Sequence, residues 1–292
     1  MASPAWKGLS TVPLSCPLSA ALWQALLTRC EATSESVEHI VRNALADYLQ
    51  VEHATLFQVS TAGALVEGLY HGEVLIGELR EHGDFGLGTF DGLDGEMVVL
   101  DGVFYQVRGD GTVHEAGDAV RTPYAMITRF PTGEGVALGD CADLAGLQAQ
   151  LDPLRDSQNV FYAVRIDGEF RSVVTRSVRP TPEGVPLVAA AAQQREFHRN
   201  DVRGTLIGFW SPGYLQTILV PGYHLHFLSE DRRSGGHLLA CAGGGLRAQV
   251  HRVADFRVSL PESATFLHAD LTRNPAEDLE RAEKPTRKES GS

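Results

Sequence analysis

The first hydrophobic pattern in the chain covers residues 9–52 and differs from everything that follows. A short extended segment, Leu9–Cys16, precedes Ser19, a suitable N-cap for a helix predicted over Ala20–Cys30. A second helix is predicted over Val37–Leu49, because apolar residues gather on one face at positions 37, 40, 41, 44, 45, 48 and 49. A strand and two helices are too few elements to bury a core alone. We therefore expect residues 1–52 to dimerise or to dock on the rest of the chain.

From about residue 53 the pattern changes to short alternating runs separated by glycine-rich turns. The strands that it predicts are Thr55–Ser60, Glu96–Leu100, Val103–Val107, Ala125–Phe130, Val160–Ile166, Glu169–Arg176, Val202–Phe209, Gly222–Leu228 and Phe256–Leu260. Asp-Gly pairs at 101–102 and 167–168 stand between such runs and predict two-residue hairpin turns. Helices are fewer, and they are predicted over Thr61–Tyr70, Cys141–Leu151, Val188–Gln194 and the tail after Asn274-Pro275.

These elements indicate the α+β class. We expect mixed, largely antiparallel sheets in two halves, residues 53–180 and residues 181–292, after the small strand-helix-helix unit at 1–52. The proline-rich stretch Arg179–Pro186 is the expected joint between the halves.

Charge and composition narrow the possible partners. The 292 residues include 25 Lys and Arg against 37 Asp and Glu, a formal net charge of −12, which argues against nucleic-acid binding as the main activity. No apolar run is long enough for a membrane-spanning helix, and the N-terminus lacks the uninterrupted apolar stretch of a secretory signal. The four cysteines lie far apart, without C-x-x-C spacing, so a cytoplasmic location is expected.

The segment Gly222–His237 holds the clearest chemical pattern. His224 and His226 alternate with apolar residues on a predicted strand, so both side chains leave the same face, with Cα atoms about 6.6 Å apart. A turn containing Gly235-Gly236 returns the chain so that His237 joins them. Three neutral nitrogen ligands with an open position are typical of a catalytic Zn²⁺ site, although imidazole also binds Fe, Ni, Co and Cu. An H-x-H pattern alone also occurs by chance.

Other candidate residues are ambiguous without a family. The glycine-rich stretch Gly83–Phe90 lacks the lysine of a phosphate-binding loop and is interpreted as structural turns. Glu96 opens a strand and by default is a solvated carboxylate. Arg176 shares a strand face with valines, as either a rim residue or an anion contact. Glu283 lies in a charged tail that by default is exposed.

Several long blocks together resemble the α-acetolactate decarboxylase family. They are LFQVSTAGALVEGLYHG, HGDFGLGTFDGLDGEMVVLDGVFYQVR, NVFYAVRIDGEF, VRGTLIGFWSPGY and GYHLHFLSEDRRSGGH, within residues 55–283. The resemblance implies a two-domain α/β fold, a homodimer, and one Zn²⁺ per chain bound by His224, His226 and His237. It also implies active-site roles for Glu96, Thr89, Arg176 and Glu283, with Glu280 as the alternative for the tail position.

The implied reaction is decarboxylation of α-acetolactate (2-hydroxy-2-methyl-3-oxobutanoate) to acetoin and CO₂, a step of the butanediol pathway. The metal acts as a Lewis acid that chelates the ketone and hydroxyl oxygens, where negative charge develops. Arg176 either pairs with the leaving carboxylate or lies beside the carbon to be protonated, Glu96 accepts the hydrogen bond of the substrate hydroxyl, and Glu283 closes the site. A hydrolase that uses zinc-bound hydroxide, with Glu96 as its base, is the alternative from the motif geometry.

Residues 9–52 also resemble the ribbon-helix-helix family, in which paired strands enter the major groove of DNA. The matching features are the extended segment and the two following helices, LSAALWQALLTRCEAT and SVEHIVRNALADYL. Lys7, just before the extended segment, is the only cation near the predicted ribbon, and Pro13 interrupts the segment, so the side chains that read base edges are missing. A DNA-binding regulator is therefore the less favoured alternative.

Overall fold

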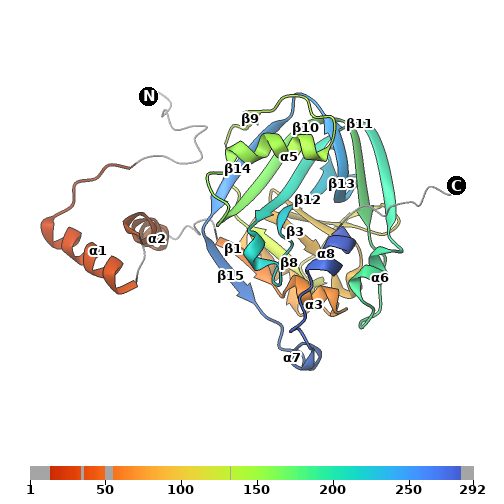
Figure 1. Cartoon of the computed structure of the whole chain (residues 1–292), viewed down its shortest axis with the longest axis horizontal. Coiled ribbons are helices and arrows are strands. Elements are labelled where there is room, and N and C mark those ends of the chain that lie inside the picture. Colours follow the sequence, from red (N-terminus) through yellow and green to blue (C-terminus); the bar gives the residue numbers. More distant parts are fainter. Residues whose placement is uncertain (1–13, 34–35, 50–54, 132, 284–292) are drawn as a thin grey trace.

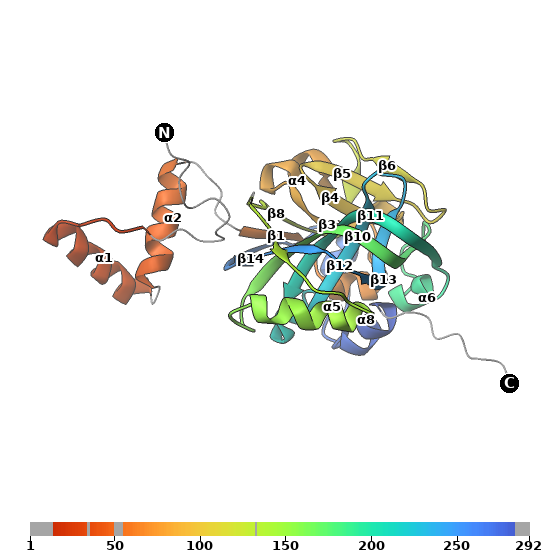
Figure 2. The ribbon, with the colours of Figure 1, turned by 90° about the horizontal axis from the view of Figure 1, so that it is seen from above.

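The computed structural model describes residues 14–33, 36–49, 55–131 and 133–283. Two helices, α1 (Ala20–Thr33) and α2 (Val37–Leu49), contact each other at the N-terminal end and lie beside the main body in Figures 1 and 2. The strand predicted over residues 9–16 lies mostly outside the described residues, and its described part, 14–16, is not a strand. Large apolar side chains of this segment are exposed, including those of Leu22, Trp23 and Tyr48.

The first large sheet has seven strands in the order β15-β1-β8-β3-β4-β5-β6. The strands are β1 (Thr55–Val59), β3 (Phe85–Thr89), β4 (Glu96–Leu100), β5 (Val103–Val107), β6 (Val113–Glu115), β8 (Ala125–Thr128) and β15 (Asp255–Ser259). All neighbours pair antiparallel except β1 and β15, which are parallel. A small ladder joins β2 (Val74–Leu75) to β7 (Arg121–Thr122).

The second sheet has six strands in the order β11-β12-β13-β10-β14-β9, and β10 also pairs with β11. The strands are β9 (Val136–Ala137), β10 (Phe161–Ser177), β11 (Arg195–Ser211), β12 (Gly222–Ser229), β13 (Gly235–Gly243) and β14 (Arg247–Val253). β11 pairs with β12, β12 with β13, β13 with β10, and β10 again with β11. These four strands therefore form a closed ring, and their inward-facing side chains share one interior. The α+β class with largely antiparallel sheets is confirmed.

The two sheets do not divide the chain at residue 180. Strands β10 and β11, on either side of Arg179–Pro186, pair along nearly their whole lengths. The chain passes from the first sheet to the second between β8 and β9, and β15 then returns to the first sheet beside β1. The proline-rich stretch therefore connects two strands of one sheet.

One of the two predicted hairpins is confirmed and the other is wrong. Asp101 and Gly102 form the β4–β5 turn, and both have positive φ. Asp167 and Gly168 instead lie inside β10, which continues from Phe161 to Ser177. The first part of β10 pairs with β14 and its second part with β13, so the Asp-Gly pair marks a change of partner within one strand.

The glycine-rich stretch at 83–90 contains a buried strand, β3, where turns were predicted. A Cβ at Gly86 would lie 2.1 Å from the carbonyl oxygen of Met126 in β8, and a Cβ at Gly88 would lie 2.3 Å from that of Tyr124. Glycine here permits close approach of neighbouring backbones, one of its known roles in strands.

Short helices cover the sheets and fill their ends. They are α3 (Ala62–Val66), α4 (Ile76–His82), α5 (Leu144–Leu151), α6 (Leu187–Ala191), α7 (Ala264–His268) and α8 (Ala276–Glu283), with 3₁₀ turns at Asp91–Leu93, Asp152–Leu154 and Gly213–Leu215. The helices predicted over Thr61–Tyr70, Cys141–Leu151 and Val188–Gln194 thus exist but are shorter than expected, whereas α2 has its predicted bounds and α1 is longer. Among the described residues, no helix has the length and apolar character needed to cross a membrane.

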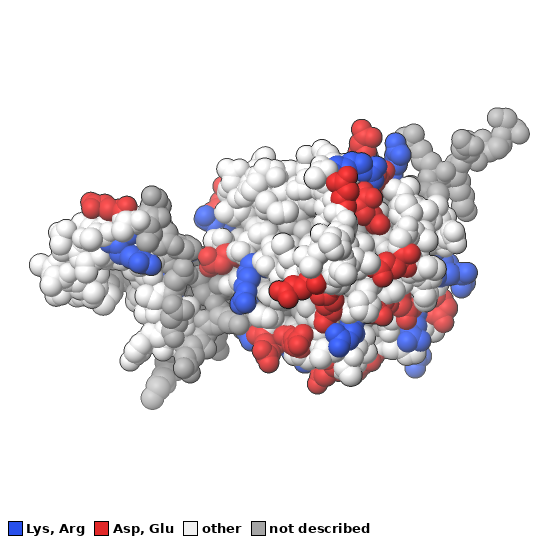
Figure 3. All heavy atoms as spheres, turned by 90° about the horizontal axis from the view of Figure 1, so that it is seen from below, with Lys and Arg blue, Asp and Glu red and all other residues white. Residues whose placement is uncertain are grey.

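The largest hydrophobic core lies between the two sheets. Alternation along β4 illustrates the layers: Val98 and Leu100 join this central core, whereas Met97 and Val99 point to an outer cluster with Ile76 of α4. A third cluster lies under α5 on the outer face of the second sheet. On the face seen in Figure 3, acidic and basic side chains are interspersed over the body.

Candidate metal centre and active site

Three histidines meet where β12 and β13 pair. His224 and His226 share one face of β12, and His226 lies directly opposite His237 of β13. Their ring centroids are 5.1–5.3 Å apart, and one nitrogen of each ring lies within 4.8 Å of the others. All three residues are buried. The turn between the strands therefore brings His237 to the other two, as predicted, but it lies at residues 230–234, and Gly235 and Gly236 belong to β13 and not to the turn.

The hydrogen bonding of His226 leaves one ring nitrogen free. Its Nδ1–H donates to the carbonyl oxygen of Met97 at 2.8 Å, since a carbonyl can only accept. The Nε2 lone pair is buried and has no hydrogen-bond partner among the described residues, and neither has Nδ1 of His224. Unpaired nitrogens at buried positions are uncommon without a ligand. These residues fit a metal ion, which is usually bound by a histidine whose second nitrogen donates to the protein.

Burial also keeps the three rings neutral. Desolvation, with the positive charge of Arg176 nearby, lowers the pKa of His224 to about 3. The pKa values of His226 and His237 fall well below the usual range for the same causes. Neutral imidazole is the form that binds metals, so no proton competes for the site near pH 7.

Two of the expected active-site residues come from facing positions of β3 and β4. Thr89 and Glu96 are paired in register at the ends of these strands. An Oε2 of Glu96 lies 3.7 Å from Nε2 of His226, and burial raises the pKa of Glu96 to about 8. The hydroxyl of Thr89 donates to the carbonyl oxygen of Gly95 at 2.7 Å. Thr89 thus supports the turn that places Glu96, and both residues line the pocket.

Arg176 and Glu283 complete the polar side of the pocket. Arg176 rises from β10 next to the histidines, and its Nη2 lies 3.5 Å from Oε1 of Glu283 at the end of α8. The other Glu283 oxygen lies 3.1 Å from Nε2 of His237. Burial raises the pKa of Glu283, an effect that Arg176 opposes. Glu283 lines the pocket and Glu280 is exposed, so the described geometry favours Glu283 for the tail position.

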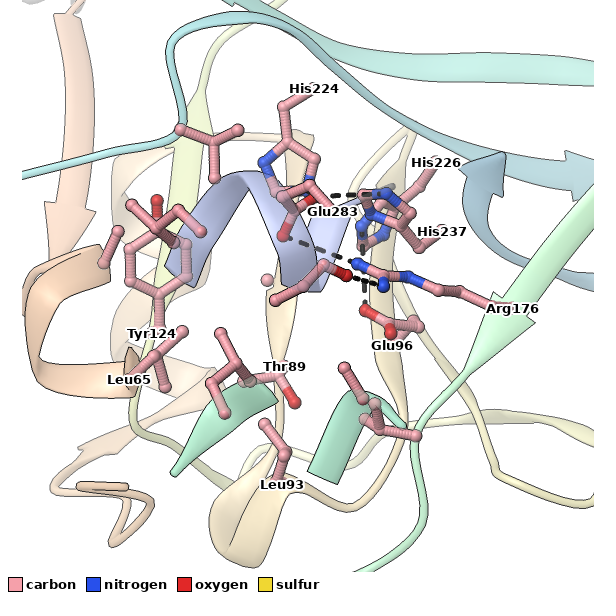
Figure 4. Close-up of a pocket in the computed structure, with 18 residues that line it drawn as sticks. Leu65, Thr89, Leu93, Glu96, Tyr124, Arg176, His224, His226, His237 and Glu283 are labelled. Carbon is pink, nitrogen blue, oxygen red and sulfur yellow. Dashed lines mark hydrogen bonds and ion pairs between the residues drawn. The ribbon is translucent and has the colours of Figure 1, made fainter. Parts of the chain in front are cut away.

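The remaining wall of the pocket is mostly apolar. It comes from several short elements around the interior: Ala62, Leu65, Leu93, Val178, Leu187, Ala191, Val220, Leu279 and Ala282. Figure 4 shows the histidines, Arg176 and Glu96 gathered on one side, with Tyr124 and Leu65 across from them. The pocket is therefore polar at one end and apolar at the other, as expected for a small organic substrate.

Two polar residues at this site were not predicted from the sequence. Tyr124 lines the pocket with its side chain buried. Gln194, just after α6, accepts a hydrogen bond from Nη1 of Arg176 at 2.9 Å, and the same nitrogen donates to the carbonyl oxygen of Ala282. Neither residue stands in a recognisable motif, so no signal in a single sequence pointed to them.

Comparison with known proteins identifies the family. The family model for alpha-acetolactate decarboxylase matches residues 56–273. The chain belongs to the alpha-acetolactate decarboxylase family. The decarboxylase of Methanosarcina mazei is 41% identical over 251 residues, which cover 86% of each chain. That of Methylococcus capsulatus is 42% identical over 236 residues, which cover 80% of this chain and 90% of the relative.

Solved structures of decarboxylases in this family share the fold. The alpha-acetolactate decarboxylase of Bacillus subtilis strain 168 superposes with a TM-score of 0.76 at 36% identity, over 79% of this chain and all of the other. The resemblance drawn from the sequence blocks is thus confirmed. The matched family region begins after the N-terminal pair of helices and ends before Glu283, so neither α1–α2 nor the tail residue is covered by the family match.

Proposed function

We propose that this chain converts α-acetolactate to acetoin and CO₂. The observation that carries the proposal is the buried group of three neutral histidines, with unpaired ring nitrogens, facing a pocket that also holds two carboxyl groups and an arginine. The relatives that this chain matches are named for this decarboxylation. A five-carbon keto acid suits a pocket with one polar and one apolar end.

We propose Zn²⁺ as the ion held by His224, His226 and His237. Three neutral ligands preserve the full positive charge of the ion, and zinc is the usual choice for such a catalytic set. When bound, a divalent ion supplies Lewis-acid stabilisation of the oxygens on which negative charge develops, and it favours the ionised form of nearby carboxyl groups. The Met97 carbonyl would fix the ring of His226 for this purpose.

The other residues bind and orient the substrate. Ionised Glu96, 3.7 Å from His226, is placed to accept the hydrogen bond of the substrate hydroxyl. Arg176 holds the end of α8 through Ala282 and Glu283. We assign its guanidinium the task of contacting the substrate next to the carbon that must be protonated. Glu283 closes the pocket from the tail, where its carboxyl group lies between Arg176 and His237. Thr89 keeps the Glu96 turn in place.

The test is a paired assay on the purified full-length protein. Acetoin and CO₂ are measured with α-acetolactate before dialysis against a chelator, after it, and after return of Zn²⁺, with metal content determined each time. We expect activity to follow zinc content. Hydrolysis of ester or amide substrates without any acetoin formation would instead favour the hydrolase alternative, in which Glu96 serves as a general base.

We also propose that the enzyme is a cytoplasmic homodimer. The support for self-association is the exposed apolar surface of α1 and α2, which residues 1–52 cannot bury by themselves. The four free cysteines support a reducing compartment. Sedimentation of the full chain and of the double variant Leu22→Ser, Trp23→Ser distinguishes dimerisation through these helices from dimerisation through the body. If the helices form the interface, the double variant is monomeric.

A further inference from the structure

Tyr124 lines the active-site pocket and carries a buried, unpaired hydroxyl. The residue is only 3% exposed, it lines the same pocket as the three histidines, and its hydroxyl has no hydrogen-bond partner among the described residues. Buried tyrosine hydroxyls usually find a partner. Tyr70 illustrates this, since its buried hydroxyl donates to the carbonyl oxygen of Val185 at 2.8 Å.

The backbone of Tyr124 is fixed on the first sheet. Its carbonyl oxygen accepts the N–H of Thr89 at 3.0 Å, and its own N–H donates to the hydroxyl of Thr122 at 3.2 Å. Gly88 allows the close approach of β3 on which these contacts depend, because a Cβ there would lie 2.3 Å from the Tyr124 carbonyl oxygen. Tyr124 therefore lines the pocket from a backbone that is held in place.

The surroundings of Tyr124 indicate what its hydroxyl can do. Burial and the nearby Glu283 carboxylate raise the pKa of the phenol, so it stays neutral and keeps a proton to donate. The polar groups of the opposite side are partly occupied: Thr89 donates to Gly95, and Nη1 of Arg176 donates to Gln194 and Ala282. Figure 4 places Tyr124 beside Leu65, across the pocket from Glu96.

We propose that Tyr124 donates a hydrogen bond to the carboxylate of the bound 2-hydroxy-3-oxo acid, an inference that rests on the proposed function. If the hydroxyl and ketone oxygens face the histidines, the carboxylate is the remaining polar group of the substrate. Toward Tyr124 it lies across the pocket from the carboxyl group of Glu96, and the negative charge of Glu283 near Tyr124 is offset by Arg176, whose Nη2 lies 3.5 Å from it. Tyr124 is thus a substrate-binding residue that orients the group to be lost.

This placement also suits the bond changes of the reaction. The bond between the carboxylate carbon and C2 breaks, its electron pair moves onto C2 and the former ketone oxygen, and a carboxylate lone pair forms the second C=O of CO₂. A proton then adds to C2. Negative charge leaves the carboxylate in this step. A cation would stabilise the carboxylate strongly in the ground state and so raise the barrier. One neutral donor orients the carboxylate without this effect.

The test compares Tyr124→Phe with the wild type, and with Tyr70→Phe as a matched control for loss of a buried phenol hydroxyl. Calorimetry on zinc-loaded protein measures the binding of 2,3-dihydroxy-2-methylbutanoate, a non-reactive acid, and of butane-2,3-diol, which lacks only its carboxylate. We expect Tyr124→Phe to weaken binding of the acid by roughly 10-fold or more and to leave binding of the diol unchanged. Tyr70→Phe changes neither.

Thermal unfolding of the ligand-free proteins supplies the second readout. Tyr124→Phe removes an unpaired buried group, so its Tm should equal or exceed that of the wild type, whereas Tyr70→Phe should unfold at a lower temperature. Equal weakening of both ligands, unchanged binding of the acid, or a lowered Tm in Tyr124→Phe would each overturn the assignment. Wild-type protein that binds neither ligand and forms no acetoin would contradict the proposed function itself.

Discussion

The Nδ1–H of His226 donates to the carbonyl oxygen of Met97, which joins the metal-site strand β12 to the first sheet through β4. This contact fixes the ring so that Nε2 faces the other two histidines. The two sheets thus cooperate in one site, with the ligands on the second sheet and their orienting carbonyl and Glu96 on the first. Disturbing either sheet should therefore affect metal binding.

His226→Ala should remove the metal. Without its Nε2 the site keeps two ligands, so zinc content should fall from about one per chain toward zero and acetoin formation should be lost with it. Added zinc should stabilise the wild type by about 3 kcal/mol at a hundredfold excess over Kd, and should not stabilise the variant. Exposed His198 on β11 offers a control, His198→Ala, that keeps its metal. Normal turnover in zinc-free His226→Ala would refute the mechanism.

Arg176→Lys should lower kcat/KM by roughly 100-fold while zinc remains bound, because one ammonium group cannot replace the planar fork that contacts Gln194, Ala282 and Glu283. Steady-state kinetics and metal analysis measure the two effects separately. Arg171→Lys, at an exposed position of the same strand, is the control and should act like the wild type. Equal kinetics for both variants would show that charge alone suffices at residue 176.

Gln194→Ala should weaken catalysis through Arg176. The amide oxygen of Gln194 accepts one of the two hydrogen bonds from Nη1, so its loss leaves the guanidinium free to turn. We expect kcat to fall by about 10-fold with little change in Tm, and Gln194→Glu to restore part of it because a carboxylate is also an acceptor. The neighbouring exposed residue supplies the control, Gln193→Ala. A loss in Tm that parallels the loss in kcat would indicate a structural role only.

The residues of the metal site were predicted from the sequence more accurately than the strands around them. The i, i+2 spacing of His224 and His226 is a local property of any strand, and the short connection to the next strand returns His237 to the same face, although the turn lies at residues 230–234 and the predicted glycine hinge belongs to β13. Strand β3 was missed because its glycines were interpreted as turn residues. They instead allow the backbone of β8 to approach closely, and this contact cannot be seen in the sequence of β3 alone. The partner change inside β10 at Asp167-Gly168 was missed for the same reason, since pairing is a long-range property.

Long-range packing also explains the missed site residues. Tyr124 lines the pocket from a loop, and Gln194 contacts Arg176 from just beyond a helix end, at positions that no periodic pattern singles out. By contrast, Glu96, Arg176 and Glu283 were named through resemblance to relatives, although as isolated residues each is equally typical of a solvated surface. The structure brings these three side chains together with the histidines in one pocket, and their catalytic roles stay predictions.

The last prediction concerns pH and the buried carboxyl group of Glu96. In the metal-free folded protein burial raises its pKa to about 8, above the ordinary value that applies in the unfolded chain. The folded state therefore holds this proton more tightly. The contribution of Glu96 to stability is complete below the unfolded pKa and is lost as the pH rises through about 8.

Glu96→Gln should remove this dependence, because an amide of similar shape stays neutral at every pH. Both proteins are unfolded with urea in the presence of a chelator. The unfolding free energy of the variant minus that of the wild type should rise by about 2–4 kcal/mol between pH 5 and pH 9. Glu283 and the histidines titrate in both proteins. The difference in unfolding free energy between the two proteins therefore reports the titration of Glu96. Glu169→Gln, at an exposed carboxyl group of β10, is the control. A stability difference that stays constant across this range would show that Glu96 is already ionised in the empty site.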